Sequence, residues 1–426
     1  MKRRAFLSFT GKVGATAALG LTSWRALAQT AATIAPLAAP AASPELLARA
    51  AAWHAQCLTL DTHVDAPLVM LRPGFDLGRR YDPAADLSQV DLPRMREGGA
   101  DAAFFAVYMA QGARTAAGHA ESKAKAHQLF DVIHTGVGRH PEAALLATEP
   151  DDLLRAAQKE TRAIFIGMEN AWPLGTDLSL VETYYQRGAR YITLCHMLNN
   201  EVCDASTDTE KPNEHGGLSP FGEQVVREMN RLGMMVDVSH TSDATFDDCL
   251  RLSRAPIIAS HSSCRTLCNH PRNLTDDQLR ALRDCGGVAH MTMFNAYVAP
   301  VIEAPERTAA MAELRTRFGG RELSPAEQIE RREAMKTINR DFPVKLNTLA
   351  QFADHIDHAV KIAGIDHVGI GTDFDGGGAV VGCLDASQLP AITAELIQRG
   401  YTQADLQKIW GGNTLRVWRD IKKAAA

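Results

Sequence analysis

Six short apolar runs in this chain end in a histidine or a carboxylate, and this repetition constrains the fold more than any other feature. The residues that close the runs are His63, Glu169, His196, His240, His261 and Asp373. Such short, β-branched runs are typical of strands buried in a parallel sheet. Polar residues placed where parallel strands end converge on one face of a barrel. The pattern therefore predicts a barrel with a polar, metal-binding centre at one end.

Strand and helix patterns alternate along most of the chain, which predicts an α/β fold, a (β/α)8 TIM-type barrel. The predicted strands are Leu58–His63, Ala102–Tyr108, Ala163–Glu169, Tyr191–His196, Met235–His240, Pro256–His261, Gly287–Phe294 and His367–Asp373. An insertion at about 295–345, after the seventh strand, contains two charged helical stretches, Arg307–Arg317 and Pro325–Arg340. It is interpreted either as a lid or contact surface at the barrel mouth or as a solvated decoration.

The N-terminal segment carries the signals of an exported protein. Adjacent Arg3 and Arg4, an apolar stretch and the small residues of Ala26-Leu27-Ala28 are typical of a signal peptide of the Tat type. A Sec signal or an anchor is the alternative. We therefore expect a periplasmic or secreted protein that uses the Tat export machinery. The predicted organisation is a signal peptide over 1–28, a disordered Ala/Pro-rich spacer over 29–44 and a single barrel domain over 45–426.

Composition excludes some classes of partner. The net charge is −5 and no basic stripe occurs, which argues against nucleic acid. The apolar stretch of the signal is shorter than the about 20 residues that a spanning helix needs, so no stable membrane anchor is expected in the mature form. Eight cysteines show no CxxC spacing and are interpreted as buried hydrophobes, with one disulfide left open. A homodimer is also left open.

Five residues have the types and positions of ligands for two metal ions. His63 and Asp65 lie two apart at a strand end, so both side chains can reach one ion. His240 and His261 end neighbouring strands, and two neutral imidazoles suit a second zinc ion. Glu169 can bridge the two ions with one oxygen each, as in two-metal hydrolases. A buried, hydrogen-bonded histidine is the alternative at any one position, but a set in register on successive strands favours metal binding.

Three further residues are candidates for chemistry or substrate binding. His196 is interpreted as a further ligand or as a donor to a developing oxyanion. Asp373 is interpreted as a ligand or as a base, whereas Asp375 in the following turn is interpreted as structural. Arg272 lies in the loop after the sixth strand, where a guanidinium can bind a substrate carboxylate in bidentate fashion, the alternative being a surface residue.

These residues stand in motifs that resemble the membrane dipeptidase (renal dipeptidase) family, the M19 metallopeptidases. The segments that carry the resemblance are Asp61-Thr62-His63-Val64-Asp65, Gly167-Met168-Glu169-Asn170, Leu194-Cys195-His196, Asp237-Val238-Ser239-His240, Ser260-His261-Ser262, His270-Pro271-Arg272-Asn273 and Gly371-Thr372-Asp373-Phe374-Asp375-Gly376. They follow the order of the family from about residue 57 to 421. Thr62 and Val64 depart from the usual Gly and Asn of the first motif.

The resemblance implies a zinc metallopeptidase that hydrolyses the peptide bond of dipeptides with two Zn²⁺ per chain. It implies that His63 and Asp65 bind one zinc ion, that His240 and His261 bind the other, and that Glu169 bridges them. Members of the family accept a D-residue at the C-terminal position, so dipeptides derived from the cell wall are expected substrates.

The resemblance also implies roles around the substrate. His196 would bind and polarise the scissile carbonyl, Asp373 would shuttle the proton, and Arg272 would hold the C-terminal carboxylate. Tyr297 can serve as a further substrate-binding residue. The alternatives are a metal-dependent amidohydrolase acting on N-acyl amino acids or lactones, and a non-catalytic binding protein that keeps the barrel. The complete ligand set and Asp373 argue against the second.

Overall fold

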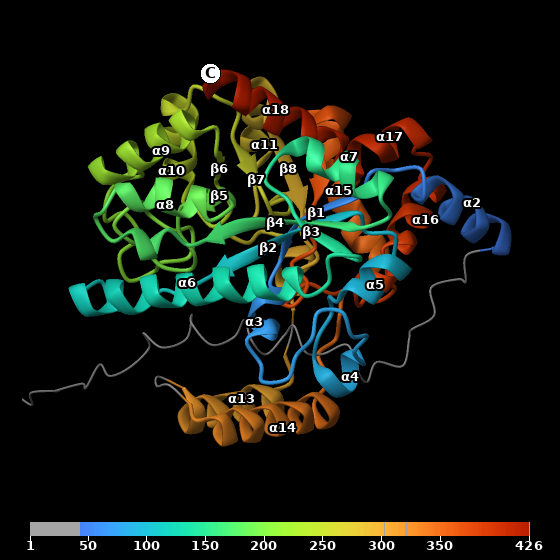
Figure 1. The fold of residues 1–426 in the computed structure, drawn as a ribbon, viewed down its shortest axis with the longest axis horizontal. Coiled ribbons are helices and arrows are strands. Elements are labelled where there is room, and N and C mark those ends of the chain that lie inside the picture. The colour runs from blue at the N-terminus through green and yellow to red at the C-terminus, as the bar shows by residue number, and fades with distance from the viewer. Residues whose placement is uncertain (1–42, 302, 320–322, 426) are drawn as a thin grey trace, which may run out of the picture.

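In a computed structural model, which describes residues 43–301, 303–319 and 323–425, the chain forms a parallel barrel surrounded by helices (Figure 1). The barrel strands pair in the order β1-β2-β4-β5-β6-β7-β8-β9. Their bounds are β1 Leu60–Val64, β2 Ala102–Tyr108, β4 Arg162–Glu169, β5 Ala189–Thr193, β6 Met235–Asp237, β7 Ile258–Ala259, β8 Val288–Met291 and β9 Val368–Ile370. Asp65 N donates to Phe374 O at 2.8 Å and Asp373 N to His63 O at 3.0 Å, which joins β1 to the segment after β9. The predicted TIM-type barrel is confirmed as a nearly closed one.

Helices fill the connections and cover the outside of the barrel (Figure 1). Their bounds are α2 Pro44–His54, α3 Ala66–Met70, α4 Pro83–Asp86, α5 Leu92–Glu97, α6 Ala116–Gly138, α7 Pro150–Gln158, α8 Ser179–Gln186, α9 Pro220–Leu232, α10 Asp243–Leu252, α11 Asp276–Asp284, α12 Asn295–Val298, α13 Pro305–Phe318, α14 Pro325–Asp341, α15 Leu349–Ala363, α16 Pro390–Gln398, α17 Gln403–Gln407 and α18 Asn413–Ala425. A short strand, β3 (Ala144–Leu146), pairs with β4 beside the barrel.

Local signals place the helix ends, as α9 illustrates. The Ser219 side chain accepts a hydrogen bond from Gly222 N, and Pro220 occupies the first turn, where its missing N–H costs nothing. Gly233 ends the helix with a left-handed φ of 67°, a conformation that glycine adopts without a steric penalty. Between these ends, residues such as Met229 are buried against the barrel, so the amphipathic pattern orients the helix.

One end of the barrel interior is filled by apolar side chains. Trp418 of α18 packs there against Phe104 and Phe165, with ring centroids 5.8 and 5.1 Å away. Tyr191 of β5 belongs to the same cluster, with its ring 5.2 Å from that of Phe104. Because α18 closes the N-terminal ends of the strands, the C-terminal ends are left for a functional site.

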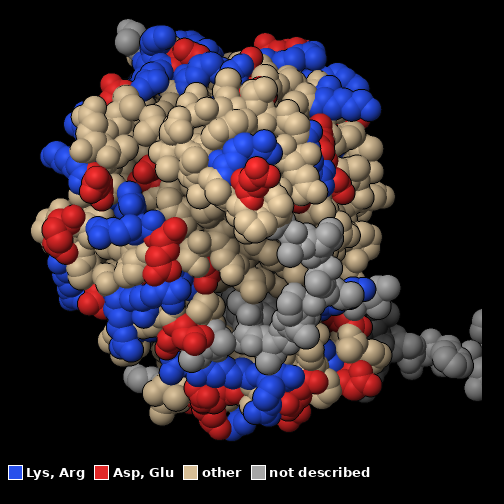
Figure 2. All heavy atoms as spheres, turned by 90° about the vertical axis from the view of Figure 1, so that its right-hand side faces the viewer, with Lys and Arg blue, Asp and Glu red and all other residues tan. Residues whose placement is uncertain are grey.

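The predicted insertion is a helical hairpin, α13 and α14, at the lower edge of Figure 1. Its helices share an apolar cluster formed by Met311, Leu314, Phe318, Met335 and Ile338. On the face drawn in Figure 2, acidic and basic side chains are interspersed over the molecule, including its lower edge. The role of the hairpin as a lid or contact surface stays a prediction.

The predicted signal peptide over 1–28 and all but the last two residues of the predicted spacer over 29–44 lie outside the described residues, which begin at 43. Among the described helices, none combines the length and apolar character needed to cross a bilayer. The eight cysteines are free thiols, and all except the partly exposed Cys285 are buried, in agreement with their interpretation as hydrophobic residues.

Candidate metal centre

The barrel places the predicted polar residues at the C-terminal ends of its strands. His63 lies within β1, Asp65 follows β1 directly, and Glu169 is the last residue of β4. Four further residues were expected as the last residues of strands, and this detail is wrong, because they lie two or three positions beyond the last paired residue. These four are His196, His240, His261 and Asp373. The chain has already left the ladder there, so the side chains turn inward from loops.

Two of these loop residues adopt a backbone conformation that costs free energy. His240 has a φ of 73° and Asp373 a φ of 64°, both in the left-handed region. Non-glycine residues are uncommon there, although Asp and His are among those that tolerate it. Such conformations persist where the surrounding structure enforces them, and they concentrate at functional sites.

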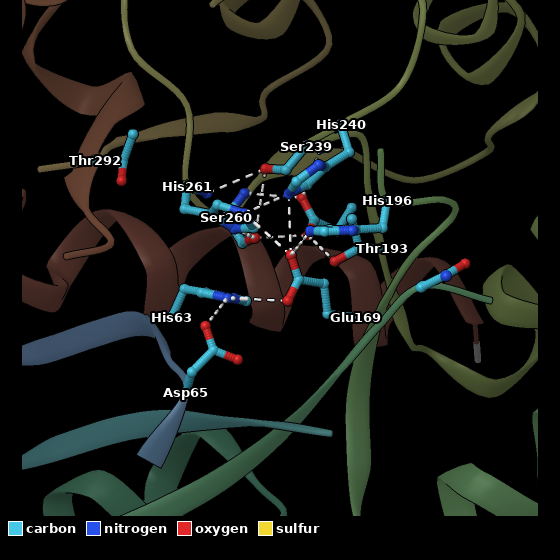
Figure 3. A network of polar contacts seen from close by, with 12 residues as sticks. His63, Asp65, Glu169, Thr193, His196, Ser239, His240, Ser260, His261 and Thr292 are labelled. Carbon is cyan, nitrogen blue, oxygen red and sulfur yellow. Dashed lines mark hydrogen bonds and ion pairs between the residues drawn. The ribbon is translucent and has the colours of Figure 1, made fainter. Parts of the chain in front are cut away.

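Glu169 lies between two groups of ligand atoms, with one carboxylate oxygen facing each (Figure 3). Its Oε2 is 3.4 Å from His63 Nε2, which is itself 3.6 Å from Asp65 Oδ2. Its Oε1 is 3.0 Å from His240 Nε2 and 3.4 Å from His261 Nε2. The structure thus brings all five predicted ligands together, with the glutamate in the middle.

The donor atoms of this cluster fit metal ions. His63 Nε2, Asp65 Oδ1 and Glu169 Oε1 are buried and have no hydrogen-bond partner within the described part of the chain, an arrangement that is costly without a ligand. The Nε2 atoms of His240 and His261 are 2.9 Å apart, a separation that requires a proton or a cation between them. Three overlapping groups of this cluster have the spacing of metal sites: His63, Glu169 and His261; Glu169, His196 and His240; and His63, Asp65 and Asp373.

Burial shifts the pKa values of His240, His261 and Glu169. It lowers the pKa of His240 and of His261 well below the ordinary value, because the imidazolium form loses its hydration. Burial likewise raises the pKa of Glu169, an effect that His63 opposes. The two histidines are therefore neutral imidazoles with lone pairs available, which is the form that binds zinc.

His196 lies close enough to serve in either of its predicted roles. Its Nε2 is 3.8 Å from Glu169 Oε1, and its ring centroid is 4.4 Å from that of His240. The ring of Tyr108 packs edge-on against it at 4.8 Å. The position is compatible both with a further ligand and with a group that contacts the substrate carbonyl.

Asp373 faces the ligands on the side of His63 and Asp65. Neither of its carboxylate oxygens accepts a hydrogen bond from any described residue, and burial raises its pKa well above the ordinary value. A Cβ at Gly376 would lie 2.0 Å from Asp65 Oδ2 and 2.2 Å from Asp373 Oδ1, so glycine is needed where the two carboxylates approach. Asp375, in contrast, accepts a hydrogen bond from Gln89 N at 2.7 Å, in agreement with a structural role.

Arg272 is buried beside the centre rather than on the surface. Its guanidinium donates to Ser262 Oγ at 3.2 Å and to His261 O at 3.0 Å. Its Cζ lies 5.2 Å from the ring centroid of Tyr297, which belongs to α12. The alternative that Arg272 is a surface residue is therefore wrong. Tyr297, another residue expected to bind the substrate, lies next to Arg272.

Two buried aspartates that anchor the ligand loops were not singled out in the sequence. Asp61 Oδ1 accepts a hydrogen bond from His63 N at 3.1 Å, and Asp237 Oδ1 accepts from Ser239 N at 3.0 Å and Ser260 N at 2.8 Å. Asp237 thereby ties the loop after β6 to the loop after β7. The available signal was an aspartate at the first position of both motif segments, two residues before His63 and three before His240.

A TIM-type barrel that buries imidazoles and carboxylates at the C-terminal ends of its strands defines the class of metal-dependent barrel hydrolases. Within this class, the chain belongs to the membrane dipeptidase family, Peptidase family M19, whose model matches residues 47–426. It is thus a metallopeptidase of the dipeptidase type, in agreement with the resemblance of its motifs.

Several proteins to which the chain is similar are named as dipeptidases. Dipeptidase aclJ of Aspergillus oryzae is 32% identical over 342 residues, which cover 79% of this chain and 71% of the relative. Dipeptidase tcpJ of Claviceps purpurea is 32% identical over 358 residues, covering 83% and 74%. Among solved structures, the probable dipeptidase PvdM from Pseudomonas aeruginosa is 33% identical with a TM-score of 0.77, and the match covers 90% of this chain and 100% of PvdM.

Proposed function

We propose that this dipeptidase uses two zinc ions, held by His63 and Asp65 on one side and by His240 and His261 on the other. The observation that carries this proposal is the position of Glu169, whose two oxygens face the two groups separately. When bound, two zinc ions lower the pKa of a water molecule and polarise the substrate carbonyl. A single ion would leave either Asp65 or His240 without a metal to bind.

The remaining residues of the centre act on the substrate. Asp373 accepts the proton of the attacking water and passes it to the leaving amine, because its buried oxygens accept no hydrogen bond from any residue that the structure describes. His196 contacts the carbonyl oxygen from the side of His240. Arg272 binds the C-terminal carboxylate, with Tyr297 packed against the guanidinium.

We extend the proposal to dipeptides with a C-terminal D-residue, which the family resemblance supports. A panel of L,L- and L,D-dipeptides, with N-acylated and C-amidated versions of each, tests this substrate class. Cleavage of the free dipeptides and weak cleavage of the N-acylated ones is the expected result. Preferential cleavage of N-acylated compounds would favour the alternative of an amidohydrolase.

The metal content tests the two-ion centre directly. Elemental analysis of protein purified without chelator should give two zinc ions per chain. His240→Ala should remove one ion and most of the activity, whereas His134→Ala, a change to a partly buried histidine on the outer helix α6, should keep both ions. Full activity with one ion or none would contradict the proposal.

We also propose that residues 1–28 direct export through the Tat route, so that the mature enzyme acts in the periplasm or outside the cell. The arginine pair at Arg3 and Arg4 supports this route. Replacing both by lysine should leave unprocessed precursor in the cytoplasm, whereas Lys2→Gln should not. Normal export of the double variant would favour the Sec route, and the mature N-terminus is expected near Gln29.

A further inference from the structure

One tyrosine connects the apolar interior of the barrel to the metal centre. Tyr191 lies in β5 with no exposed surface, and its ring belongs to the apolar cluster that α18 closes. Its hydroxyl, however, lies 2.9 Å from His63 Nδ1 and 3.1 Å from Thr62 O. The ring therefore spans the barrel interior, from β5 to β1, and ends at a proposed metal ligand.

The hydrogen bonds of this contact indicate that Nδ1 of His63 carries a proton. A phenol has one proton, and Thr62 O can only accept, so the Tyr191 hydroxyl donates to that carbonyl. The phenol oxygen must then accept from His63, whose proton sits on Nδ1. In the neutral imidazole, which is the form that binds a metal ion, the lone pair of His63 is therefore on Nε2, the atom that faces Asp65 and Glu169.

The backbone of β4 leaves room for this ring. Gly167 pairs with Tyr191 in the β4–β5 ladder, and a Cβ at Gly167 would lie 2.0 Å from Tyr191 Cζ. Phe104 contacts the ring from β2. The glycine two residues before Glu169 is therefore required by the tyrosine, and the packing fixes the hydroxyl in place.

A different set of hydrogen bonds holds the ring of His261. Ser260 Oγ donates to Asp237 Oδ2 at 2.6 Å and lies 2.8 Å from His261 Nδ1, so the serine accepts the imidazole proton. In both histidines a proton on Nδ1 is donated to a hydroxyl oxygen. The hydroxyl next to His63 donates in turn to a backbone carbonyl, whereas the hydroxyl next to His261 donates to a carboxylate. The two sets of hydrogen bonds share no residue, although Thr62 Oγ1 donates to Ser260 O at 2.6 Å and the ring centroids of His63 and His261 are 3.8 Å apart. Because neither contact uses the Tyr191 hydroxyl, removal of that hydroxyl should affect the side of His63 alone.

We propose that Tyr191 is the positioning residue of His63, and that its phenol sets the metal affinity of the half of the centre formed by His63 and Asp65. This inference rests on the proposed function, because it takes His63 to be a metal ligand. Partners that hold the second ring nitrogen of a ligand histidine fix its orientation, and their loss typically lowers metal affinity about 10–100-fold.

Tyr191→Phe keeps the ring against Gly167 and removes only the hydroxyl. Zinc affinity should be measured by chelator competition, and the two positions should be followed separately by Co²⁺ absorption during titration of the metal-free protein. Tyr401→Phe is the matched control, because its phenol donates to Asp357 Oδ1 at 2.9 Å in the outer helical layer. The catalytic constants should be measured as a function of added zinc.

Tyr191→Phe is expected to keep one ion at wild-type affinity and to bind the other about 10–100-fold more weakly. Added zinc should restore kcat, with KM unchanged, and the Tyr401→Phe variant should bind both ions normally. The inference is overturned if Tyr191→Phe binds both ions as the control does, or if it loses both together without recovery in excess zinc. Fewer than two ions in the wild-type protein would overturn the proposed function and this inference with it.

Discussion

The replacement Asp373→Asn separates proton transfer from metal binding and from folding. Asparagine has the same shape as aspartate and tolerates the left-handed φ of 64° at this position. The hydrogen bonds of Asp373 that hold the fold come from its backbone, whose N donates to His63 O and whose O accepts from the N–H groups of residues 376–378. The substitution leaves these bonds intact.

The expected effects on stability and on rate differ widely for this reason. No described residue donates a hydrogen bond to the Asp373 carboxylate, so the free energy of unfolding should change by less than about 1 kcal/mol. The basic oxygen, however, is lost. General acid–base groups typically contribute roughly 10²–10⁴-fold, so kcat should fall by that factor, which corresponds to about 3 to 5 kcal/mol of barrier. KM should change little, because Arg272 still binds the substrate.

The assay combines steady-state kinetics on one dipeptide, elemental analysis and thermal unfolding. Asp375→Asn is the matched control, because Asp375 also has a φ of 64° but bonds to Gln89 and not to the centre. Its kcat should stay within a few-fold of wild type. Loss of a metal ion in Asp373→Asn would make Asp373 a ligand, and near-normal kcat with both ions would place the proton acceptor elsewhere; either result refutes the assignment.

Two further predictions follow from contacts in the centre. Arg272→Ala should raise KM for dipeptides with a free C-terminal carboxylate and have little effect on C-amidated ones, and equal loss on both in steady-state assays would contradict a carboxylate-binding role. Gly376→Ala should place a methyl group about 2 Å from the oxygens of Asp65 and Asp373, so metal content and activity should both fall. An alanine variant with two ions and normal kcat would show that the two carboxylates do not need this close approach.

Local sequence patterns were sufficient for the fold and for predicting which residues gather at the candidate metal centre. Each barrel strand is a short apolar run, and six of the predicted runs end in a chemically distinctive residue such as Glu169 or His261. The ends of β2 and β4 were predicted correctly, but several other strand ends were placed too late, as at β7, which ends at Ala259 rather than His261. The apolar run continues past the last ladder pair, and hydrophobicity alone does not mark where pairing stops.

The sequence by itself determined which residue types lie at the barrel mouth. The local pattern of apolar residues predicts each strand, and the residue that closes each run is read directly from the sequence. Only the tertiary structure decided how they meet. The contact of Tyr191 with His63 joins positions 128 residues apart, and the division of Glu169 between two groups needs the closed barrel. Both depend on register, since a slip of one residue would turn Gly167 and Glu169 out of the interior. Register is a property of the whole closed sheet, which no single segment specifies.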